Sequence, residues 1–189
     1  MKASFLAEKF AAALAYDRYV RTGNDDQRRR WQQVYMAAQV TDAQKQFVAG
    51  FVRDMKVLLV SGIWCGDCVQ QCPLLQRIAE ANPARIDLRL LDRDQHRDLS
   101  EKVRINGGDR VPVVLFLAED HELCSVFGDR TLNRYRALAA RHLGPSCPTG
   151  IVPPGADELA ETLQDWLNEF ERVQLMLRLS SRLRQKHND

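Results

Sequence analysis

Two cysteines separated by two residues are the groups in this chain whose type and spacing could do chemistry. They lie in Trp64-Cys65-Gly66-Asp67-Cys68, directly after a short apolar run and at the start of a helical pattern. Sulfurs one helical turn apart can form a disulfide. The first sulfur would lie at the helix N-terminus, where free N–H groups and the helix dipole stabilise a thiolate and lower the thiol pKa. The spacing therefore predicts thiol–disulfide exchange, with Cys65 as the nucleophile and Cys68 as the resolving thiol.

Trp64 and Asp67 are the neighbours that could influence this chemistry. The Trp64 ring could shield the Cys65 sulfur and receive a polypeptide substrate, or it could simply pack at the rim. The Asp67 carboxylate could accept helix N–H groups, which is a structural role. Its negative charge would also oppose a thiolate at Cys65. Because these two effects of Asp67 have opposite signs, the sequence predicts no value for the reduction potential.

The elements that must position the motif begin with a helical lead-in. Apolar residues at helical spacing predict one helix over 4–20 and a second from about 26 to 40. A capping-box pattern beginning at Thr41 starts a third helix. Residues 1–54 are therefore predicted to form a helical N-terminal extension.

The next segment, residues 55–143, alternates between strand and helix patterns. The first strand is apolar throughout, which is typical of a strand buried on both faces. Strands are predicted at 56–62, 86–91, 111–117 and 122–127. Helical patterns follow the first strand and the last, and a polar, helix-prone stretch follows the second. This order predicts an α/β domain with a mixed sheet.

The chain ends in a predicted linker and a long helix. Residues 144–155 contain four prolines and three glycines, which leave no regular element. Residues 156–189 are predicted to carry one amphipathic helix to about residue 186, with an apolar stripe in alternating four- and three-residue steps. The stripe must be covered, either by the N-terminal helices of the same chain or by a second copy in a homodimer.

The motif and its surroundings resemble the thioredoxin family. Trp-Cys-Gly-x-Cys follows a buried strand, and Pro73 lies five residues after Cys68, where thioredoxins carry a proline in the active-site helix. Val111-Pro112 resembles the cis-proline dipeptide that faces the cysteines in that family. The resemblance covers residues 55–143. The Trp-Cys-Gly-Asp-Cys form with a helical extension looks like a bacterial thioredoxin-like branch.

This resemblance implies a thioredoxin fold, in which helices flank a central mixed sheet, with extra N-terminal helices and a long C-terminal helix. It implies a protein-disulfide oxidoreductase with no metal and no cofactor beyond a redox-active disulfide Cys65–Cys68. Partners would be protein disulfides and an upstream electron donor such as a thioredoxin reductase. The residues that contact substrate would be Trp64, Gly66, Asp67, Val111 and Pro112. A proline lacks a backbone donor, so the Val111 backbone could pair with an extended substrate segment.

Two positions depart from the family pattern. Leu59 and Leu90 stand where thioredoxins carry a buried Asp, which helps to deprotonate the resolving cysteine, and its Lys partner. Loss of both leaves an apolar site without an orphaned charge. Proton transfer to and from Cys68 would then need another group or water, and Asp67 is the nearest candidate in the sequence. Arg110 could favour a thiolate or an acidic substrate, or it could be a solvated loop charge.

The other cysteines allow further interpretations. Cys72 lies four residues after Cys68, on the same helical face. A closed zinc site needs four ligands, and the sequence does not place Cys124 or His142 beside these two. A second disulfide, between Cys68 and Cys72 or at Cys147, is an alternative to the simpler role of a small buried residue for Cys72 and Cys124.

Composition limits the function classes. The net charge is +2, from 27 basic and 25 acidic residues, which gives no argument for nucleic-acid or membrane binding. Glu8 and Lys9 interrupt any signal-peptide core, and no apolar run reaches the ~18 residues of a membrane span. Five cysteines without a secretory signal argue against a structural disulfide framework. A cytoplasmic protein is therefore expected.

Two functions of different classes follow. The first is an oxidoreductase that exchanges disulfides with proteins through Cys65 and Cys68. The second is a binding module on a thioredoxin scaffold that holds a partner through its C-terminal helix, with the redox centre idle or regulatory. The intact cysteine pair and Pro112 favour the first.

Overall fold

The computed structural model describes residues 1–143 and 157–189, and the predicted linker at 144–155 lies outside them. Helices come first, and their bounds are α1 Ala3–Ala12, α2 Tyr16–Val20, α3 Asp25–Ala37 and α4 Asp42–Ala49. The middle of the chain carries β1 Met55–Ser61, α5 Gly66–Ala79, β2 Ile86–Asp92, α6 Arg97–Ser100, the 3-10 helix η1 Glu101–Val103, β3 Val113–Ala118, β4 Leu123–Gly128 and α7 Leu132–Leu143. The described chain ends with α8 Glu158–Leu179 and α9 Ser181–His187.

The four strands form one sheet in the order β2-β1-β3-β4. β1 pairs parallel with β2 and antiparallel with β3, and β3 pairs antiparallel with β4. β1 is central and almost wholly buried, which explains why its sequence is apolar on both faces rather than alternating. The predicted mixed sheet flanked by helices is confirmed.

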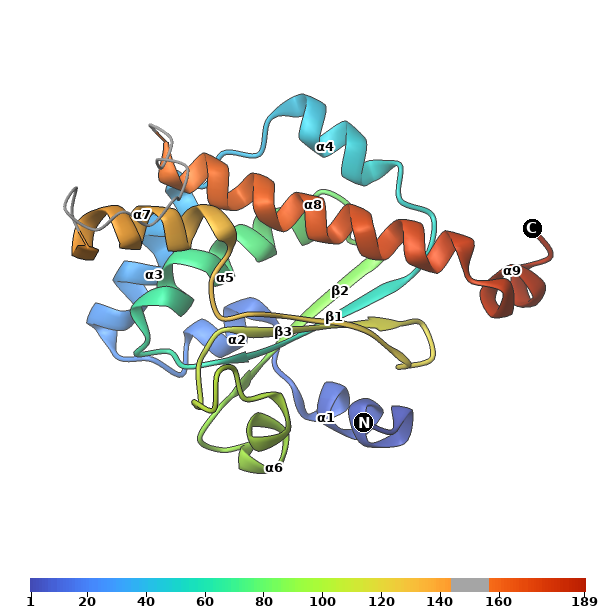
Figure 1. Cartoon of the computed structure of the whole chain (residues 1–189), viewed down its shortest axis with the longest axis horizontal. Coiled ribbons are helices and arrows are strands. Elements are labelled where there is room, and N and C mark those ends of the chain that lie inside the picture. Colours follow the sequence, from blue (N-terminus) through green and yellow to red (C-terminus); the bar gives the residue numbers. More distant parts are fainter. Residues whose placement is uncertain (144–156) are drawn as a thin grey trace.

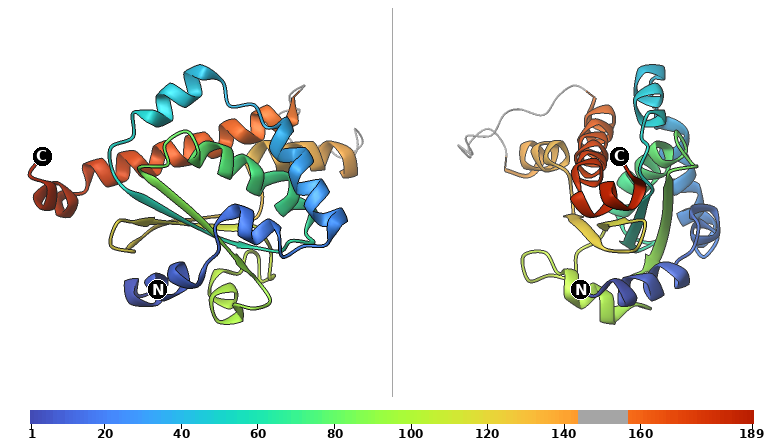
Figure 2. Two further views of the ribbon diagram at one scale, coloured as in Figure 1. Left: turned by 180° about the vertical axis from the view of Figure 1, so that it is seen from behind. Right: turned by 90° about the vertical axis from the view of Figure 1, so that its right-hand side faces the viewer.

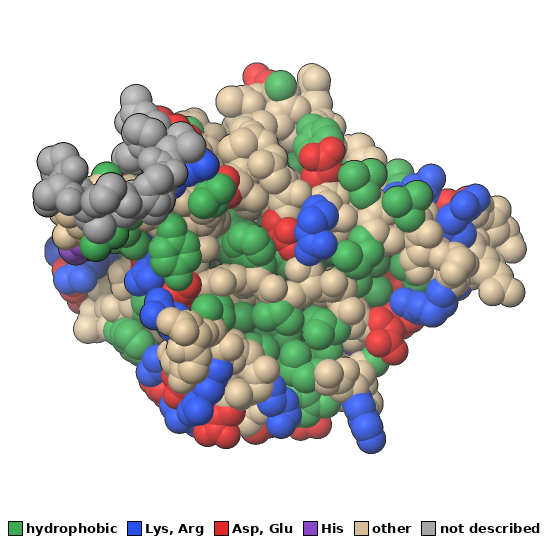
Figure 3. Space-filling model, viewed as in Figure 1, with side chains coloured by type: hydrophobic (Ala, Val, Ile, Leu, Met, Phe, Trp, Pro, Cys, Tyr) green, Lys and Arg blue, Asp and Glu red, His purple; other side chains and the backbone are tan. Residues whose placement is uncertain are grey.

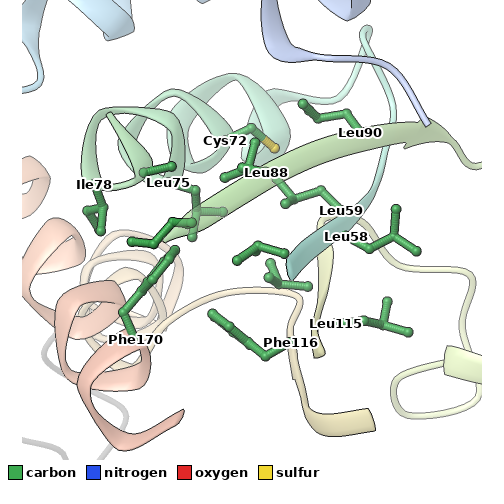
Figure 4. Packing of buried hydrophobic residues seen from close by; sticks show 14 of the residues in the cluster. Leu58, Leu59, Cys72, Leu75, Ile78, Leu88, Leu90, Leu115, Phe116 and Phe170 are labelled. Carbon is green, nitrogen blue, oxygen red and sulfur yellow. The ribbon is translucent and has the colours of Figure 1, made fainter. Parts of the chain in front are cut away.

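Helices cover both faces of the sheet (Figures 1 and 2). α5 and α8 lie on one face, and α1 and α6 lie on the other. Alternate residues of a strand face opposite sides, so Leu59 and Phe116 point toward α5 and α8 while Leu58 and Leu115 point away from them (Figure 4). The Phe116 and Phe170 rings meet edge to face at 5.1 Å, joining β3 to α8.

The predicted helix over 4–20 is wrong in one respect, because the structure divides it into α1 and α2. Between them Leu14 forms an isolated bridge with Leu90 of β2. The Leu14 N–H donates to the Leu90 carbonyl at 2.9 Å, and the Leu90 N–H donates back at 2.8 Å. β2 is an edge strand whose backbone groups need partners, so the chain breaks its helix to supply them.

The C-terminal helix is also interrupted, where a single helix to residue 186 was predicted. Ser180 ends α8, and its hydroxyl accepts a hydrogen bond from the Leu183 N–H at 3.4 Å as the N-cap of α9. The apolar stripe of α8 is buried within the same chain, and Trp166 meets Phe127 of β4 at 5.0 Å. α8 therefore packs on α5, α7 and the sheet more than on the N-terminal helices.

Acidic and basic side chains are interspersed on the face shown in Figure 3. Hydrophobic side chains also gather there, below α8. In the described ranges, no helix combines the length and the apolar character needed to cross a membrane.

Candidate active site

The two cysteines lie where the chain leaves β1 and enters α5. Cys65 has extended backbone angles and is the N-cap of α5, and its N–H donates to the Gly62 carbonyl at 2.9 Å. Its thiol is partly exposed, whereas Cys68 is fully buried one turn further along. Both are free thiols. The Gly62 N–H donates to Cys68 Sγ at 3.4 Å.

The two thiols are electrostatically coupled. The pKa of Cys65 is raised, first by its hydrogen bond with Cys68 and then by burial and by the charge of Cys68, while the N–H groups of Cys68 and Asp67 act to lower it. Burial raises the pKa of Cys68 well above its usual value. The expected fall in the Cys65 pKa is therefore opposed by the second thiol. The two cysteines titrate as a pair, and the less buried Cys65 sulfur is the better place for the single negative charge.

Trp64 lies on the rim of this site with its side chain about half exposed, at 49%. Gly62 lies beneath it, and a Cβ there would meet the indole at 2.9 Å, so only glycine lets the ring lie this close to the backbone. The Arg93 guanidinium lies over the Trp64 ring, 4.8 Å from the ring centroid. Trp64 is thus held in place beside Cys65 with a broad apolar surface open to solvent.

The Val111–Pro112 peptide bond is cis, and it lies directly beside the cysteines. The Cys65 thiol donates to the Val111 carbonyl at 3.5 Å. Gly128 of β4 packs on the other side, and a Cβ there would lie 2.4 Å from the Pro112 carbonyl oxygen. Its φ of +148° also suits glycine alone. The fold therefore brings the predicted dipeptide to the predicted nucleophile.

Gly66 is the first residue of α5 and faces open space. A Cβ at this position would meet no atom within 4 Å. Steric crowding within the chain therefore does not require a glycine here.

Asp67 forms ion pairs with two arginines that lie more than 60 residues later in the sequence. Arg130 Nη2 lies 2.6 Å from Asp67 Oδ2, and Arg134 Nη2 lies 3.1 Å from Oδ1. The side chain of Asp67 is mostly buried. Both oxygens are therefore taken, so the carboxylate is poorly placed to carry the proton of Cys68. The two guanidinium groups also offset the negative charge that was expected to oppose a thiolate.

Asp129 pairs with two arginines beside the cis-proline loop. Arg110 Nη1 lies 2.9 Å from Asp129 Oδ2 and Arg130 Nη1 lies 3.2 Å from it, while the Tyr135 hydroxyl donates to Oδ1. Burial acts to raise the pKa of Asp129, but the hydrogen bonds from Tyr135 and Arg110 and the charge of Arg130 outweigh it. The pKa of Asp129 is therefore lowered. Arg110 is therefore an exposed loop charge whose guanidinium is paired with Asp129.

Beneath the cysteines, the two positions that depart from the family pattern are apolar and buried. Leu59 and Leu90 are register partners on β1 and β2, and both are fully buried. Figure 4 shows them on the α5 side of the sheet, near Cys72. The Cys72 sulfur lies 3.7 Å from the hydroxyl of Ser61. In the ranges 1–143 and 157–189, no group of three or more His, Cys, Asp or Glu side chains could hold a metal ion. Cys147 is outside those ranges.

Sequence analysis missed the residues that surround the pair from other elements. Ser61 carries the one hydroxyl in the buried run of β1. A single polar residue in an apolar strand next to the cysteine motif could have indicated a role beside the two sulfurs. Trp31 of α3 donates its indole N–H to the Ile63 carbonyl at 3.0 Å and fixes the loop before Cys65. Arg130 and Arg134 carry no local pattern that could have placed them beside Asp67.

Comparisons with known proteins agree with this geometry. A family model described as thioredoxin matches residues 13–140. A crystal structure of a Pseudomonas aeruginosa protein of unknown function is 21% identical, with a TM-score of 0.68 over 88% of this chain and 96% of that one. An HIV epitope-scaffold structure is 16% identical, with a TM-score of 0.64 over 93% of this chain and 98% of that one. No curated protein sequence matches the chain. The family match begins well inside the predicted N-terminal extension.

Proposed function

This chain belongs to the thioredoxin family, and from that premise we propose that it is a thiol–disulfide oxidoreductase acting on proteins. The observation that supports the proposal most directly is the unequal burial of two free thiols one turn apart. Cys65 is accessible and Cys68 is fully buried. A substrate disulfide can reach the first sulfur, and only an internal reaction can reach the second.

The exchange runs in two displacements that balance atoms and electrons. The Cys65 thiolate attacks one sulfur of a substrate disulfide, and the other substrate sulfur leaves as a thiolate and takes up a proton. Cys68 then attacks the Cys65 sulfur, which releases the second substrate thiol and forms the Cys65–Cys68 disulfide. The substrate gains two electrons, and an external dithiol donor such as a thioredoxin reductase restores the pair.

Substrate contacts are assigned to the surface around the accessible sulfur. The exposed Trp64 ring offers an apolar face, and the open space at Gly66 admits a backbone. Val111 and Pro112 form the opposite wall, where an extended segment could lie alongside the loop. Asp67 has both oxygens bound by arginines, so its contribution is to hold α5 against α7. The pair itself is the only redox cofactor in this scheme, in a cytoplasmic setting.

Reduction of insulin disulfides by a dithiol reagent tests the proposal. We expect Cys65→Ser to abolish the catalysed rate, because the remaining member of the pair, Cys68, is fully buried and cannot reach a substrate disulfide. Cys68→Ser should attack and then stall as a mixed disulfide that intact-mass spectrometry detects. Cys124→Ser, a partly exposed thiol on β4, serves as the matched control and should keep the parent rate. Equal rates for Cys65→Ser and the parent protein would overturn the proposed function.

A further inference from the structure

Ser61 is a buried polar side chain directly beneath the cysteine pair. It ends β1 and is fully buried. Its carbonyl accepts a hydrogen bond from the Arg93 N–H at 2.8 Å, which fixes the backbone there. Its hydroxyl lies 3.7 Å from Cys72 Sγ. A buried hydroxyl needs partners, and the Cys72 sulfur of α5 is a weak one at this distance.

Cys68 receives donors from this same strand end. The Gly62 N–H points at its sulfur at 3.4 Å. Burial raises the pKa of Cys68 first, and the hydrogen bonds from Cys65 and Ser61 act against that rise. The Gly62 N–H is therefore directed at the resolving sulfur, while the Ser61 hydroxyl at the same strand end lies beside the Cys72 sulfur, one turn further along α5.

Tyr19 closes this polar pocket from the N-terminal helices. It lies on α2 and is only 1% exposed. Its hydroxyl has no hydrogen bond of normal geometry with any described residue. Burial raises the pKa of Tyr19, and the Ser61 hydroxyl is the largest influence that lowers it. A tyrosine hydroxyl left without a partner in the interior, with a serine as its polar neighbour, is a donor available to that serine.

We infer that the Gly62 N–H and the Ser61 hydroxyl, backed by the Tyr19 hydroxyl, form a donor set that stabilises the Cys68 thiolate during the resolving step. This inference rests on the proposed oxidoreductase function. Leu59 stands where a buried carboxylate could act as a general base toward Cys68, and leucine cannot do so. In this scheme hydrogen-bond donors stabilise the Cys68 thiolate instead. Ser61 and Tyr19 are positioning residues in this scheme because they act through Cys68 and do not touch substrate.

The step that these donors assist is the attack of Cys68 on the mixed disulfide between Cys65 and the substrate. Cys68 gives up its proton to solvent, from which the departing substrate thiolate takes one up, and the donors hold the negative charge on the Cys68 sulfur while it attacks Cys65. The bond between Cys65 and the substrate sulfur breaks, the Cys65–Cys68 disulfide forms, and the departing substrate thiolate takes up one proton. Charge-assisted hydrogen bonds to a thiolate in a dry site are stronger than those to a neutral thiol, so the donors lower the barrier.

The other titratable groups around Cys68 are few. Cys65 and Cys72 face it from α5, and Cys72 acts to raise its pKa. Tyr16 of α2 interacts with Cys72. Asp67 precedes Cys68 in α5 and is paired with Arg130 and Arg134. Asp92 is the register partner of Ser61 on β2, and its Oδ1 accepts the N–H groups of the turn that follows.

The test separates the two displacements in time. The reduced protein is mixed with an excess of a chromogenic aromatic disulfide, which releases one coloured thiolate when Cys65 attacks and a second when Cys68 resolves the adduct. Both phases are followed by stopped-flow absorbance across a pH series. The variants are Ser61→Ala and Tyr19→Phe. The matched controls are Ser100→Ala, a buried serine on α6 away from the site, and Tyr16→Phe, a buried tyrosine on the same helix as Tyr19.

We expect Ser61→Ala to slow the second phase about tenfold near neutral pH and to move its pH midpoint upward by about one unit, with the first phase unchanged. Tyr19→Phe should have a smaller effect in the same direction. Ser61→Thr, which keeps the hydroxyl, should restore the rate. Both controls should match the parent protein.

Three results would count against the inference or its premise. A second phase that is unchanged in Ser61→Ala overturns the donor set. Equal slowing of both phases overturns it as well, since that is the result of a general disturbance of the loop. Absence of the first phase in the parent protein overturns the proposed function, and this outcome is distinct from the other two.

Discussion

At the scale of single residues, charge pairing around α5 is the feature that most affects stability. Asp67, Arg130 and Arg134 are all largely shielded from solvent, with exposed side-chain fractions of 14, 24 and 13%. Removing one member of such a group leaves the others desolvated without a partner, which costs more than the pair contributes.

We expect Asp67→Asn to lower the free energy of unfolding by about 1–3 kcal/mol, because two guanidinium groups lose the shared negative charge and one of them faces an NH₂ group in place of an acceptor oxygen. Urea denaturation measures the change. Asp25→Asn is the control, since Asp25 pairs with Arg28 on the open surface of α3 with its side chain 94% exposed. That change should stay within about 0.5 kcal/mol. Equal effects of the two substitutions would contradict a structural role for the Asp67 cluster.

A second residue-scale prediction concerns pH. The pKa of Asp129 is lowered in the folded protein, chiefly by the Tyr135 and Arg110 hydrogen bonds acting against burial. A lowered folded-state pKa gives stability that is present above the unfolded pKa of about 3.9 and lost as the pH falls through the folded value. We expect the stability gap between the parent protein and Asp129→Asn to be constant down to about pH 5 and to shrink below about pH 4.

Urea unfolding of both proteins across this pH range measures that gap. Asp42→Asn, at an exposed position in the first turn of α4, is the comparison and should show little gap at any pH. A gap that stays constant to the lowest pH would show that the pKa of Asp129 is the same in the folded and the unfolded protein, and would contradict the lowered pKa.

At the scale of elements, the N-terminal helices help to position the loop that carries the two cysteines. Trp31 of α3 is fully buried and donates to the Ile63 carbonyl, one residue before Trp64. A Cβ at Gly23, between α2 and α3, would lie 2.8 Å from the Ile63 side chain, so this helical turn fits closely against the loop. Helices distant in sequence therefore fix the backbone that carries the cysteines.

We expect Trp31→Phe to lower the free energy of unfolding by about 1–3 kcal/mol, because the Ile63 carbonyl loses its donor and the core loses volume. Hydrogen exchange at the backbone of residues 62–65 should increase with it. Met36→Ala, on the same helix at 65% exposure, is the control and should change stability by no more than about 0.5 kcal/mol. Unchanged exchange in the loop would mean that α3 does not hold it.

At the scale of the whole molecule, α8 completes the core on one face of the sheet. Its buried stripe meets β3, β4 and α5, and Phe170 is fully buried against Phe116. Gln174 joins it to the start of the sheet, where its side chain bonds both the N–H and the carbonyl of Arg53, at 2.9 and 3.1 Å. The apolar stripe is therefore covered by its own chain, which leaves the predicted homodimer without this reason to form.

We expect Phe170→Ala to lower the free energy of unfolding by about 3–5 kcal/mol, a large share of a typical domain stability. The loss should not depend on protein concentration, since both partners belong to one chain. Leu175→Ala, on the same helix at 53% exposure, is the matched control. A midpoint of unfolding that rises with protein concentration would instead indicate that α8 is part of an interface between two copies.

The sequence alone predicted the features that depend on neighbours in the chain. A continuous apolar run predicted the buried strand β1, and two cysteines at a helix start predicted the reactive pair. The order of elements predicted the mixed sheet, because strand and helix patterns are local periodicities. Its errors fell on helix ends, at Leu14 and Ser180, where a backbone bridge and a side-chain cap overrode helical spacing.

Only the tertiary structure decided what surrounds the two sulfurs. Asp67 meets arginines 63 and 67 positions away in the sequence, and the Trp31 indole of α3 donates to the Ile63 carbonyl 32 positions further on. Such contacts leave no local pattern, because they arise from the packing of whole elements on one sheet. The sequence alone was enough to propose Cys65 and Cys68 as a redox pair, whereas the burial, charges and donors around the two sulfurs depend on how the chain folds.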